Sequence, residues 1–375
     1  MEKKGKVFVG VSGGVDSSVA LALLQKEGYD VTGVFLKVWS PDFLPCDWRE
    51  ERRSAMRVCA TLGVPFITLD CEVEYKKEVV DYMMREYSIG RVPNPDIFCN
   101  KYVKFGVFLN KALEMGADYI ATGHYAVVQG GNNSFSKVLG ASQPDFRKNN
   151  YYLLESVDKE KDQSYFLYTL NQEQLKHTLF PVGGKTKPDV RRLAEKFGLP
   201  TATKKDSQGL CFIGKIDMKD FLSHYIKTKI GNILNTKGEI IGNHDGALFL
   251  TIGQRHGFNI IKKTTEDPRY FVVSKDLENN TITVASKENE SGEVYSVKEI
   301  FISDMHFINK EPAFPLKTSV RIRYRQEKQD CSVVKEKNGF RVIFEKPQNA
   351  ISVGQSAVFY DGPVCLSGGI IEKTG

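Results

Sequence analysis

A short stretch rich in glycine and serine lies near the N-terminus and has the residue types needed to bind an anion. The sequence Ser-Gly-Gly-Val-Asp-Ser-Ser occupies positions 12–18, directly after the apolar residues 7–11. We expect a buried strand, a tight turn and then a helix that begins at about Ser17. Such a turn directs backbone N–H groups and the positive end of the helix dipole at one point. Because no lysine follows the glycines, the pattern predicts a phosphate site other than a Walker A loop, with an ordinary βα turn of small residues as the alternative.

Two of the seven cysteines lie in contexts that favour a reactive thiol. Cys99 follows the two prolines of the segment 93–98, and we expect a helix to begin at about Lys101. A thiolate just before a helix N-terminus is favoured by the helix dipole. Cys211 lies in a loop with a glycine on each side, and such a loop can move, as delivery of sulfur requires.

The other five cysteines are expected to be small, buried, apolar residues. The sequence contains no Cys-x-x-Cys pair and no histidine at zinc-finger spacing from a cysteine, so we expect no structural zinc site, no disulfide framework and no iron–sulfur cluster. These five are Cys46, Cys59, Cys71, Cys331 and Cys365.

Strands that alternate with helices over the first half of the chain predict an α/β fold with a doubly wound parallel sheet. In such sheets ligands bind beyond the carboxyl ends of the strands. The 12–18 loop, Leu36 and residues 122–125 would lie at that edge, where Leu36 could line an adenine pocket and Gly123 could let a nucleotide approach the backbone. The expected strands are 7–11, 31–38, 65–69 and 118–122, and the expected helices are 17–26, 50–62, 75–87, 101–115 and 188–197.

Changes in pattern along the chain predict three domains. We expect a catalytic domain over 1–205, a small middle domain over 206–291 that carries Cys211 near its start, and a C-terminal β-barrel over 292–375. Residues 130–150 are rich in glycine, asparagine and serine, and we expect them to join two β-like segments as an extended hairpin or as an insertion.

Three arginines suggest a face of the barrel that binds phosphates. Arg321, Arg323 and Arg325 alternate along an expected strand over 317–324, so they would share one face. Such a row suits contact with a nucleic-acid backbone, and the alternative is a solvated strand face.

Composition sets outer limits on function. The chain has 375 residues and a formal net charge of +6, which permits a polyanionic partner without requiring one. No apolar run approaches the roughly 20 residues of a membrane helix. The first strand follows the N-terminus directly, which leaves no room for a targeting segment, so we expect a cytoplasmic protein.

The stretch 12–18 resembles the PP-loop of the ATP pyrophosphatases, which cleave ATP to AMP and pyrophosphate. Together with seven further motifs in the same order, it resembles the tRNA-specific 2-thiouridylase family over nearly the whole chain. The resemblance implies ATP with Mg²⁺ as co-substrate and the anticodon stem-loop of tRNA as partner. The eight motifs occupy 12–18, 94–100, 122–126, 161–167, 206–214, 251–257, 320–325 and 353–360.

The resemblance also assigns site residues. The hydroxyls of Ser12, Ser17 and Ser18 would donate to pyrophosphate, and Asp16 would reach a magnesium ion or orient the loop. His124 would contact tRNA, although it could instead be a loop histidine with satisfied hydrogen bonds. The residues implied to bind ATP are Gly10, Val11, Ser12, Gly13, Gly14, Val15, Asp16, Ser17, Ser18, Leu36 and Gly123. The residues implied to bind tRNA are Asn94, Pro95, Asp96, His124, Lys161, Asp162, Gln163, Arg323, Tyr324 and Gln355.

The implied reaction places sulfur on C2 of the wobble uridine (U34). The C2 oxygen would attack the α-phosphate of ATP and release pyrophosphate, and AMP would leave when sulfur attacks C2. Cys211 would carry a persulfide received from an upstream persulfide carrier or a cysteine desulfurase. Cys99 would be the nucleophile that completes sulfur release through a transient disulfide with Cys211. Asp96 would contact the base or transfer a proton.

Two other functions remain open at this point. An amidating or ligating PP-loop enzyme, of the argininosuccinate or GMP synthetase type, would need no cysteine pair. A tRNA-binding protein that uses ATP only as a conformational ligand would form neither AMP nor a thiolated nucleoside.

Overall fold

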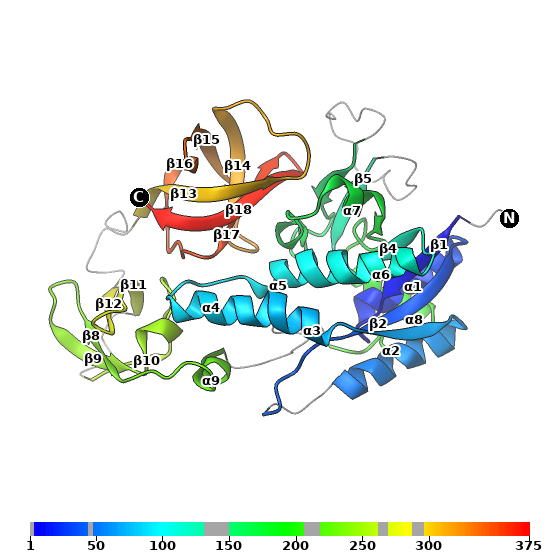
Figure 1. The fold of residues 1–375 in the computed structure, drawn as a ribbon, viewed down its shortest axis with the longest axis horizontal. Coiled ribbons are helices and arrows are strands. Elements are labelled where there is room, and N and C mark those ends of the chain that lie inside the picture. The colour runs from blue at the N-terminus through cyan, green and yellow to red at the C-terminus, as the bar shows by residue number, and fades with distance from the viewer. Residues whose placement is uncertain (1–3, 44–47, 131–149, 206–217, 262–268, 287–295) are drawn as a thin grey trace.

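The computed structural model describes residues 4–43, 48–130, 150–205, 218–261, 269–286 and 296–375. Three sheets organise them: a parallel five-stranded sheet, a second five-stranded sheet and an eight-stranded sheet (Figure 1). Two long helical segments, residues 72–88 and 95–114, run across the centre of the molecule. Among the described residues, no helix is both long enough and apolar enough to cross a membrane.

Helices cover both faces of the parallel sheet, whose strand order is β3-β2-β1-β4-β7 (Figure 1). Val7 and Val9 of the first strand pack with one set of helices, whereas Phe8 between them packs with the two long helical segments. The predicted doubly wound parallel sheet is therefore confirmed. Its strands are β1 Lys6–Gly10, β2 Asp30–Lys37, β3 Phe66–Asp70, β4 Tyr119–Ala121 and β7 Thr178–Leu179, and the helices on the Val7 side are α1 Val15–Lys26, α2 Trp48–Leu62 and α8 Lys187–Lys196.

The helix that contains Cys99 begins earlier than predicted. The side chain of Asn94 accepts a hydrogen bond from the N–H of Ile97 at 3.4 Å, and Pro95 occupies the first helical turn, where its missing N–H costs nothing. Cys99 is therefore the fifth residue of the helix, and the prediction that it precedes the helix is wrong. The helix comprises α5 Pro95–Phe98, the π-helical η2 Cys99–Phe108 and α6 Leu109–Glu114.

Two other helices begin close to where the sequence places them. The first helix, α1, begins at Val15, two residues before the predicted start. The helix expected over 188–197 is α8, which begins at Lys187 after a capping box formed by Thr186 and Asp189. The segment over residues 72–88 comprises α3 Glu72–Tyr75, the π-helical η1 Lys76–Asp81 and α4 Tyr82–Ser88.

The middle part of the chain forms its own small sheet, with strand order β10-β9-β8-β12-β11. Its strands are only three to seven residues long, and such short strands carry little periodic signal in the sequence. Ile233, Val272 and Ile282 form its core. The elements are α9 Met218–Ser223, β8 Gly231–Leu234, β9 Ile240–His244, η5 Ala247–Phe249, β10 Phe258–Ile260, β11 Tyr270–Asp276 and β12 Thr281–Ser286.

The C-terminal strands form a closed six-stranded barrel, as predicted, because the last strand pairs back onto the first. Val320, Val333 and Phe359 contribute to its core. The predicted domain boundaries at 205 and 291 adjoin or fall among residues outside the described ranges and stay predictions. The barrel strands are β13 Ser296–Phe307, β14 Leu316–Arg321, β15 Gln329–Glu336, β16 Gly339–Asn349, β17 Ser356–Asp361 and β18 Val364–Thr374.

A hairpin from the N-terminal half extends the barrel sheet. The strands β5 Ala126–Gln129 and β6 Tyr152–Glu155 pair antiparallel, and β6 pairs with β18 through Leu154 opposite Val364 and Leu153 opposite Cys365. The predicted hairpin is thus present, and its connection lies outside the described residues. After it come η4 Ser164–Phe166 and α7 Gln172–Lys176.

The row of three arginines does not form. Strand β14 ends at Arg321, and the chain then turns: the N–H of Ile322 donates to the side-chain oxygen of Gln326 at 3.0 Å, and Arg325 has a left-handed backbone with φ of 63°. The prediction that Arg321, Arg323 and Arg325 share one strand face is therefore wrong.

Candidate active site

The glycine-rich loop connects β1 to α1 at the carboxyl edge of the parallel sheet. Gly13 has φ of +75°, and a Cβ at this position would lie 2.6 Å from the carbonyl oxygen of Glu51 and 3.0 Å from Cβ of Ser54. Only glycine fits both the conformation and the space. The close approach of α2 thus explains why the loop has glycine at position 13.

Hydroxyl groups hold the loop in shape. The N–H of Ser12 donates to Oγ of Ser17 at 3.2 Å, and Oγ of Ser18 donates to the carbonyl of Gly14 at 2.7 Å. Ser18 is completely buried, so its hydroxyl stabilises the loop and does not face solvent. The Oγ atoms of Ser12 and Ser17 lie 3.3 Å apart and share a hydrogen bond. Such a preformed turn can receive an anion with little reorganisation.

Asp16, in the first turn of α1, has two partners that the sequence did not reveal. The ammonium of Lys187 lies 2.7 and 2.8 Å from its two carboxylate oxygens, and the hydroxyl of Tyr125 donates to it at 2.8 Å. The side chain of Lys187 is only 10% exposed. Lys187 and Tyr125 therefore fix the position of Asp16, and its implied role, to reach a magnesium ion or to orient the loop, stays a prediction.

A second lysine also contacts the loop. The ammonium of Lys204 donates to the carbonyl of Gly13 at 3.0 Å, and the hydroxyl of Ser54 donates to the same oxygen at 3.2 Å. Lys187 and Lys204 lie 171 and 191 positions from their loop partners. No local pattern could have identified them, although both would add positive charge where a pyrophosphate would bind.

Gly123 packs directly against the loop. A Cβ on Gly123 would lie 2.6 Å from the backbone nitrogen of Ser17 and 2.8 Å from the carbonyl carbon of Asp16. A contact between two backbone segments therefore requires this glycine. Leu36 lies at the end of β2 and is 5% exposed. Both residues lie at the sheet edge predicted for the nucleotide.

His124 is buried and neutral near pH 7. Its Nδ1 lies 2.7 Å from the hydroxyl of Thr122, and its Nε2 lies 3.5 Å from the ammonium of Lys104. Burial, with the nearby Lys104 charge, holds the pKa of His124 well below its usual value. Lys104 belongs to the same helical segment as Cys99, so this contact joins the Cys99 helix to the 122–125 loop.

Cys99 is fully buried within η2. The next residue, Asn100, donates through Nδ2 to the carbonyl of Phe166 at 3.0 Å, which ties the Cys99 helix to η4. Cys211 lies outside the described residues, and so does any Cys99–Cys211 disulfide. Asp96 lies in the first turn of α5, three residues before Cys99.

Four of the five cysteines expected to be structural are buried, as predicted, and Cys46 lies outside the described residues. Burial raises the pKa of Cys59 and of Cys71 to about 11 and that of Cys331 to about 12. It also raises the pKa of Cys365 well above the usual value. Thiols of this kind stay protonated at neutral pH. Among the described residues, no group of three or more His, Cys, Asp or Glu residues could hold a metal ion.

The residues expected to bind tRNA come together from three parts of the chain. Gln355 of the barrel donates through Nε2 to the carbonyl of Val92 at 2.8 Å, which holds the segment before Asn94 against the barrel. The ring of Tyr324 lies 4.5 Å from that of Phe166, just after the 161–163 segment. Arg323 donates to the carbonyl of Ala350. The structure thus places the 94–96 segment, the 161–163 segment and the barrel side by side.

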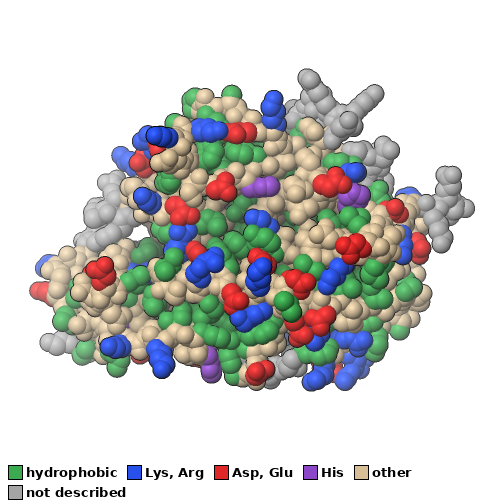
Figure 2. Space-filling model, in the orientation of Figure 1, with side chains coloured by type: hydrophobic (Ala, Val, Ile, Leu, Met, Phe, Trp, Pro, Cys, Tyr) green, Lys and Arg blue, Asp and Glu red, His purple; other side chains and the backbone are tan. Residues whose placement is uncertain are grey.

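Two of the residues expected to bind tRNA are held by burial or by hydrogen bonds within the protein. Gln163 and Tyr125 exchange hydrogen bonds of 2.8 and 2.9 Å, and Asp162 is 3% exposed. On the face in Figure 2, Lys and Arg side chains are interspersed with Asp and Glu, so this view shows no separate basic surface.

Comparison with known proteins covers almost the full chain. Residues 5–215 match a family described as a tRNA methyl transferase HUP domain, residues 219–286 its PRC-barrel domain, and residues 297–371 an aminomethyltransferase beta-barrel domain. The tRNA-specific 2-thiouridylase MnmA of Alkaliphilus oremlandii is 44% identical over 99% of this chain and 98% of its own length. The proteins of the same name from Stutzerimonas stutzeri and Pasteurella multocida are 43% and 44% identical over 99% of this chain and 95% and 94% of their own lengths.

Proposed function

The chain belongs to the tRNA-specific 2-thiouridylase family, and we infer that it is an ATP-dependent sulfurtransferase that converts the wobble uridine of tRNA into 2-thiouridine. The full-length identity to proteins of that name supports this function. The observation that carries it is the preformed loop over 12–18, which lies at the carboxyl edge of the sheet next to Gly123 and His124. The helix that contains Cys99 contacts this same edge through Lys104.

The nucleotide half of the reaction makes the C2 oxygen of uridine a leaving group. We propose that this oxygen attacks the α-phosphate, so that a P–O bond to pyrophosphate breaks and an adenylated base forms. Backbone N–H groups of the loop and the N-terminus of α1 would receive the pyrophosphate. Lys187 and Lys204 would add positive charge there, and a magnesium ion that accompanies ATP would share the phosphate charge.

The sulfur half of the reaction needs two cysteines. The terminal sulfur of a Cys211 persulfide would attack C2 and displace AMP, leaving a C2–S–S–Cys211 linkage. The thiolate of Cys99 would then attack Sγ of Cys211, which releases 2-thiouridine and forms a Cys99–Cys211 disulfide. An external dithiol would reduce that disulfide, and a persulfide carrier or a cysteine desulfurase would reload Cys211. Asp96 would contact the base or transfer a proton.

The family points to the cytoplasm as the place of action, because tRNA and persulfide carriers meet there. Contacts with tRNA would come from the 94–96 and 161–163 segments and from Arg323, Tyr324 and Gln355 of the barrel. The base would leave the anticodon stack, at a cost of a few kcal/mol.

Mass analysis of tRNA nucleosides tests this function. The protein is incubated with tRNA, ATP, magnesium and a persulfide source, and the expected products are 2-thiouridine, AMP and pyrophosphate. Cys99→Ser and Cys211→Ser should each abolish 2-thiouridine, whereas Cys331→Ala, a change at a buried barrel cysteine, should not. Full turnover by both serine variants would refute the sulfur mechanism. A methylated nucleoside in place of 2-thiouridine would refute the function itself.

A further inference from the structure

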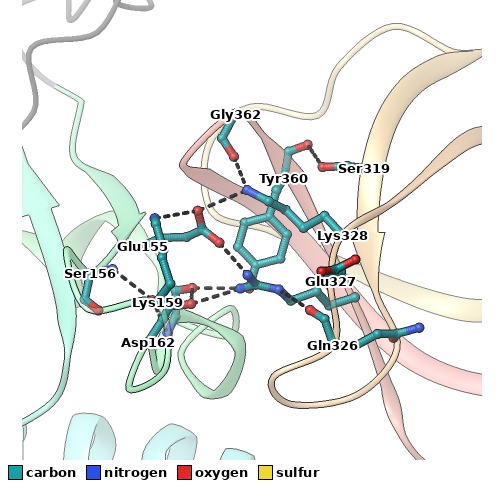
Figure 3. Close-up of polar contacts among 12 residues, drawn as sticks. Glu155, Ser156, Lys159, Asp162, Ser319, Gln326, Glu327, Lys328, Tyr360 and Gly362 are labelled. Atoms are coloured by element: carbon teal, nitrogen blue, oxygen red, sulfur yellow. Dashed lines mark hydrogen bonds and ion pairs between the residues drawn. The ribbon is translucent and has the colours of Figure 1, made fainter.

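A buried cluster of charges joins the barrel to the N-terminal half of the chain (Figure 3). The guanidinium of Arg321 lies 2.8 Å from Glu155 and 3.0 Å from Asp162, and the ammonium of Lys328 lies 3.0 Å from Glu155. Glu155 and Asp162 are each 3% exposed. Arg321 belongs to β14 and Glu155 to β6, so each ion pair crosses the junction.

Arg321 is held in a single position. Its guanidinium lies over the ring of Tyr360, 5.1 Å from the ring centroid, and Nε donates to the carbonyl of Gln326 at 2.9 Å. Its side chain is 11% exposed. A planar donor fixed on an aromatic ring and shared between two carboxylates is not available to phosphates in solution.

The two carboxylates differ in their surroundings. Burial would raise the pKa of Glu155, but the facing ammonium groups of Lys159 and Lys328 outweigh it and lower that pKa. For Asp162 burial dominates and raises the pKa, although the N–H of Ser156 donates to it at 2.9 Å. Asp162 pairs with the Arg321 cation and also accepts from Oγ of Ser164 at 2.8 Å, whereas Glu155 has Lys159 and Lys328 in addition to Arg321.

From Asp162 one peptide bond, to Gln163, and then a series of hydrogen bonds lead to the nucleotide loop. Asp162 is followed by Gln163, whose N–H donates to the carbonyl of Tyr125 at 2.8 Å. The side-chain oxygen of Gln163 accepts from the N–H of Tyr125 at 2.9 Å. The hydroxyl of Tyr125 then donates to Asp16 of the loop at 2.8 Å. Anchoring Asp162 thus restricts Gln163 and Tyr125, and through them Asp16.

We propose that Arg321 is a positioning residue for the nucleotide site: by anchoring Asp162 from the barrel, it holds Gln163 and Tyr125 where Tyr125 can orient Asp16. The barrel then contributes to ATP binding in addition to any contact with tRNA. This inference rests on the proposed function for the use of ATP, and it departs from the sequence-based expectation that Arg321 faces nucleic-acid phosphates.

The main test compares Arg321→Gln with Arg341→Gln, a matched change on the outer side of the barrel. ATP binding is measured by equilibrium dialysis, and tRNA binding is measured at several salt concentrations. Arg321→Gln should raise the Kd for ATP about tenfold, a size typical of mutations that act through a contact network. The salt dependence of tRNA binding should match that of Arg341→Gln, because Arg321 makes no phosphate contact in this proposal. A loss of folded protein alone would lower the number of ATP sites without changing their Kd.

Two outcomes would overturn the proposal. One is an unchanged Kd for ATP in Arg321→Gln. The other is weaker tRNA binding with a salt slope reduced by about one, because that is the signature of a lost phosphate contact. If Arg321→Gln does not fold, Tyr125→Phe is the second variant, because it removes the last hydrogen bond of the series. It should raise the Kd for ATP, and an unchanged value would equally refute the proposal.

A double variant separates positioning from simple loss of charge. In Arg321→Gln/Asp162→Asn no unpaired carboxylate remains at Asp162, while Glu155 keeps Lys159 and Lys328. A neutral amide pair can restore the anchor, so ATP affinity should recover part of its loss relative to Arg321→Gln. A further loss would contradict the anchor. Because dialysis does not need turnover, these results stand even if the parent protein forms no 2-thiouridine.

Discussion

Replacing Gly123 by alanine should damage the nucleotide site selectively. The added Cβ would lie 2.6 Å from the backbone nitrogen of Ser17, 2.8 Å from the carbonyl carbon of Asp16 and 2.9 Å from Cα of Ser17. Ordinary contacts begin at 3.4 Å, so one backbone segment must move by about 0.8 Å. All three neighbouring atoms are main-chain atoms, so no side chain can rotate out of the way.

The size of the effect follows from the cost of overpacking. Inserting a methyl group into a packed site costs typically about 1–3 kcal/mol. If the loop moves, that cost appears in ATP binding, where about 1.4 kcal/mol corresponds to a factor of ten. We therefore expect the Kd for ATP to rise by roughly 5- to 150-fold in Gly123→Ala. The affinity for tRNA should stay close to that of the parent protein.

A second glycine provides the control. Gly116 has φ of +78°, and a Cβ added there would have no atom of the described residues within 4 Å, so Gly116→Ala strains the backbone far from the loop. Both variants should unfold at lower temperature, but only Gly123→Ala should lose ATP affinity in equilibrium dialysis. A Gly123→Ala protein that is less stable yet binds ATP as tightly as Gly116→Ala would refute the reasoning.

Three further outcomes are expected. The pKa of His124 is lowered in the folded protein, so below about pH 6.5 the unfolded chain binds a proton there and the folded chain does not. The free energy of unfolding should therefore fall as the pH is lowered from about 6.5 to about 5.5. This fall, measured by urea unfolding, should be smaller in His124→Gln. Lys187→Met should reduce ATP affinity at least about tenfold in dialysis, because Asp16 loses its cation, whereas Lys196→Met on the same helix should not. Cys59 and Cys331 should resist iodoacetamide at pH 8 in the folded protein and react in urea, as peptide mapping can show; equal labelling in both states would contradict their raised pKa values.

Local sequence signals predicted the N-terminal sheet well. Apolar runs such as residues 7–11 mark strands that are buried on both faces, and Thr186 with Asp189 forms a recognisable capping box. The Cys99 helix starts six residues before the predicted Lys101, although Asn94 as N-cap and Pro95 in the first turn carry a known signal for a helix start.

Long-range contacts could not be predicted in the same way. The pairing of Asp16 with Lys187 joins residues 171 positions apart, and nothing near either residue indicates it. The alternating arginines after residue 320 fit a strand, but the side chain of Gln326 and the left-handed Arg325 turn the chain there. For the catalytic cysteines, the assigned roles stay predictions.

The pairing of β6 with β18 has a consequence for synthesis on the ribosome. Strand β18 contains the last strand residues of the chain, Val364–Thr374, whereas β6 is complete more than two hundred residues earlier. Leu154 packs against Val127 and Val364, so part of its cover comes from β18. Until β18 has been synthesised, β6 therefore presents an unpaired strand edge with Leu154 partly uncovered, which is a site for aggregation or chaperone binding. This edge of β6 can thus reach its final packing only after β18 has left the ribosome.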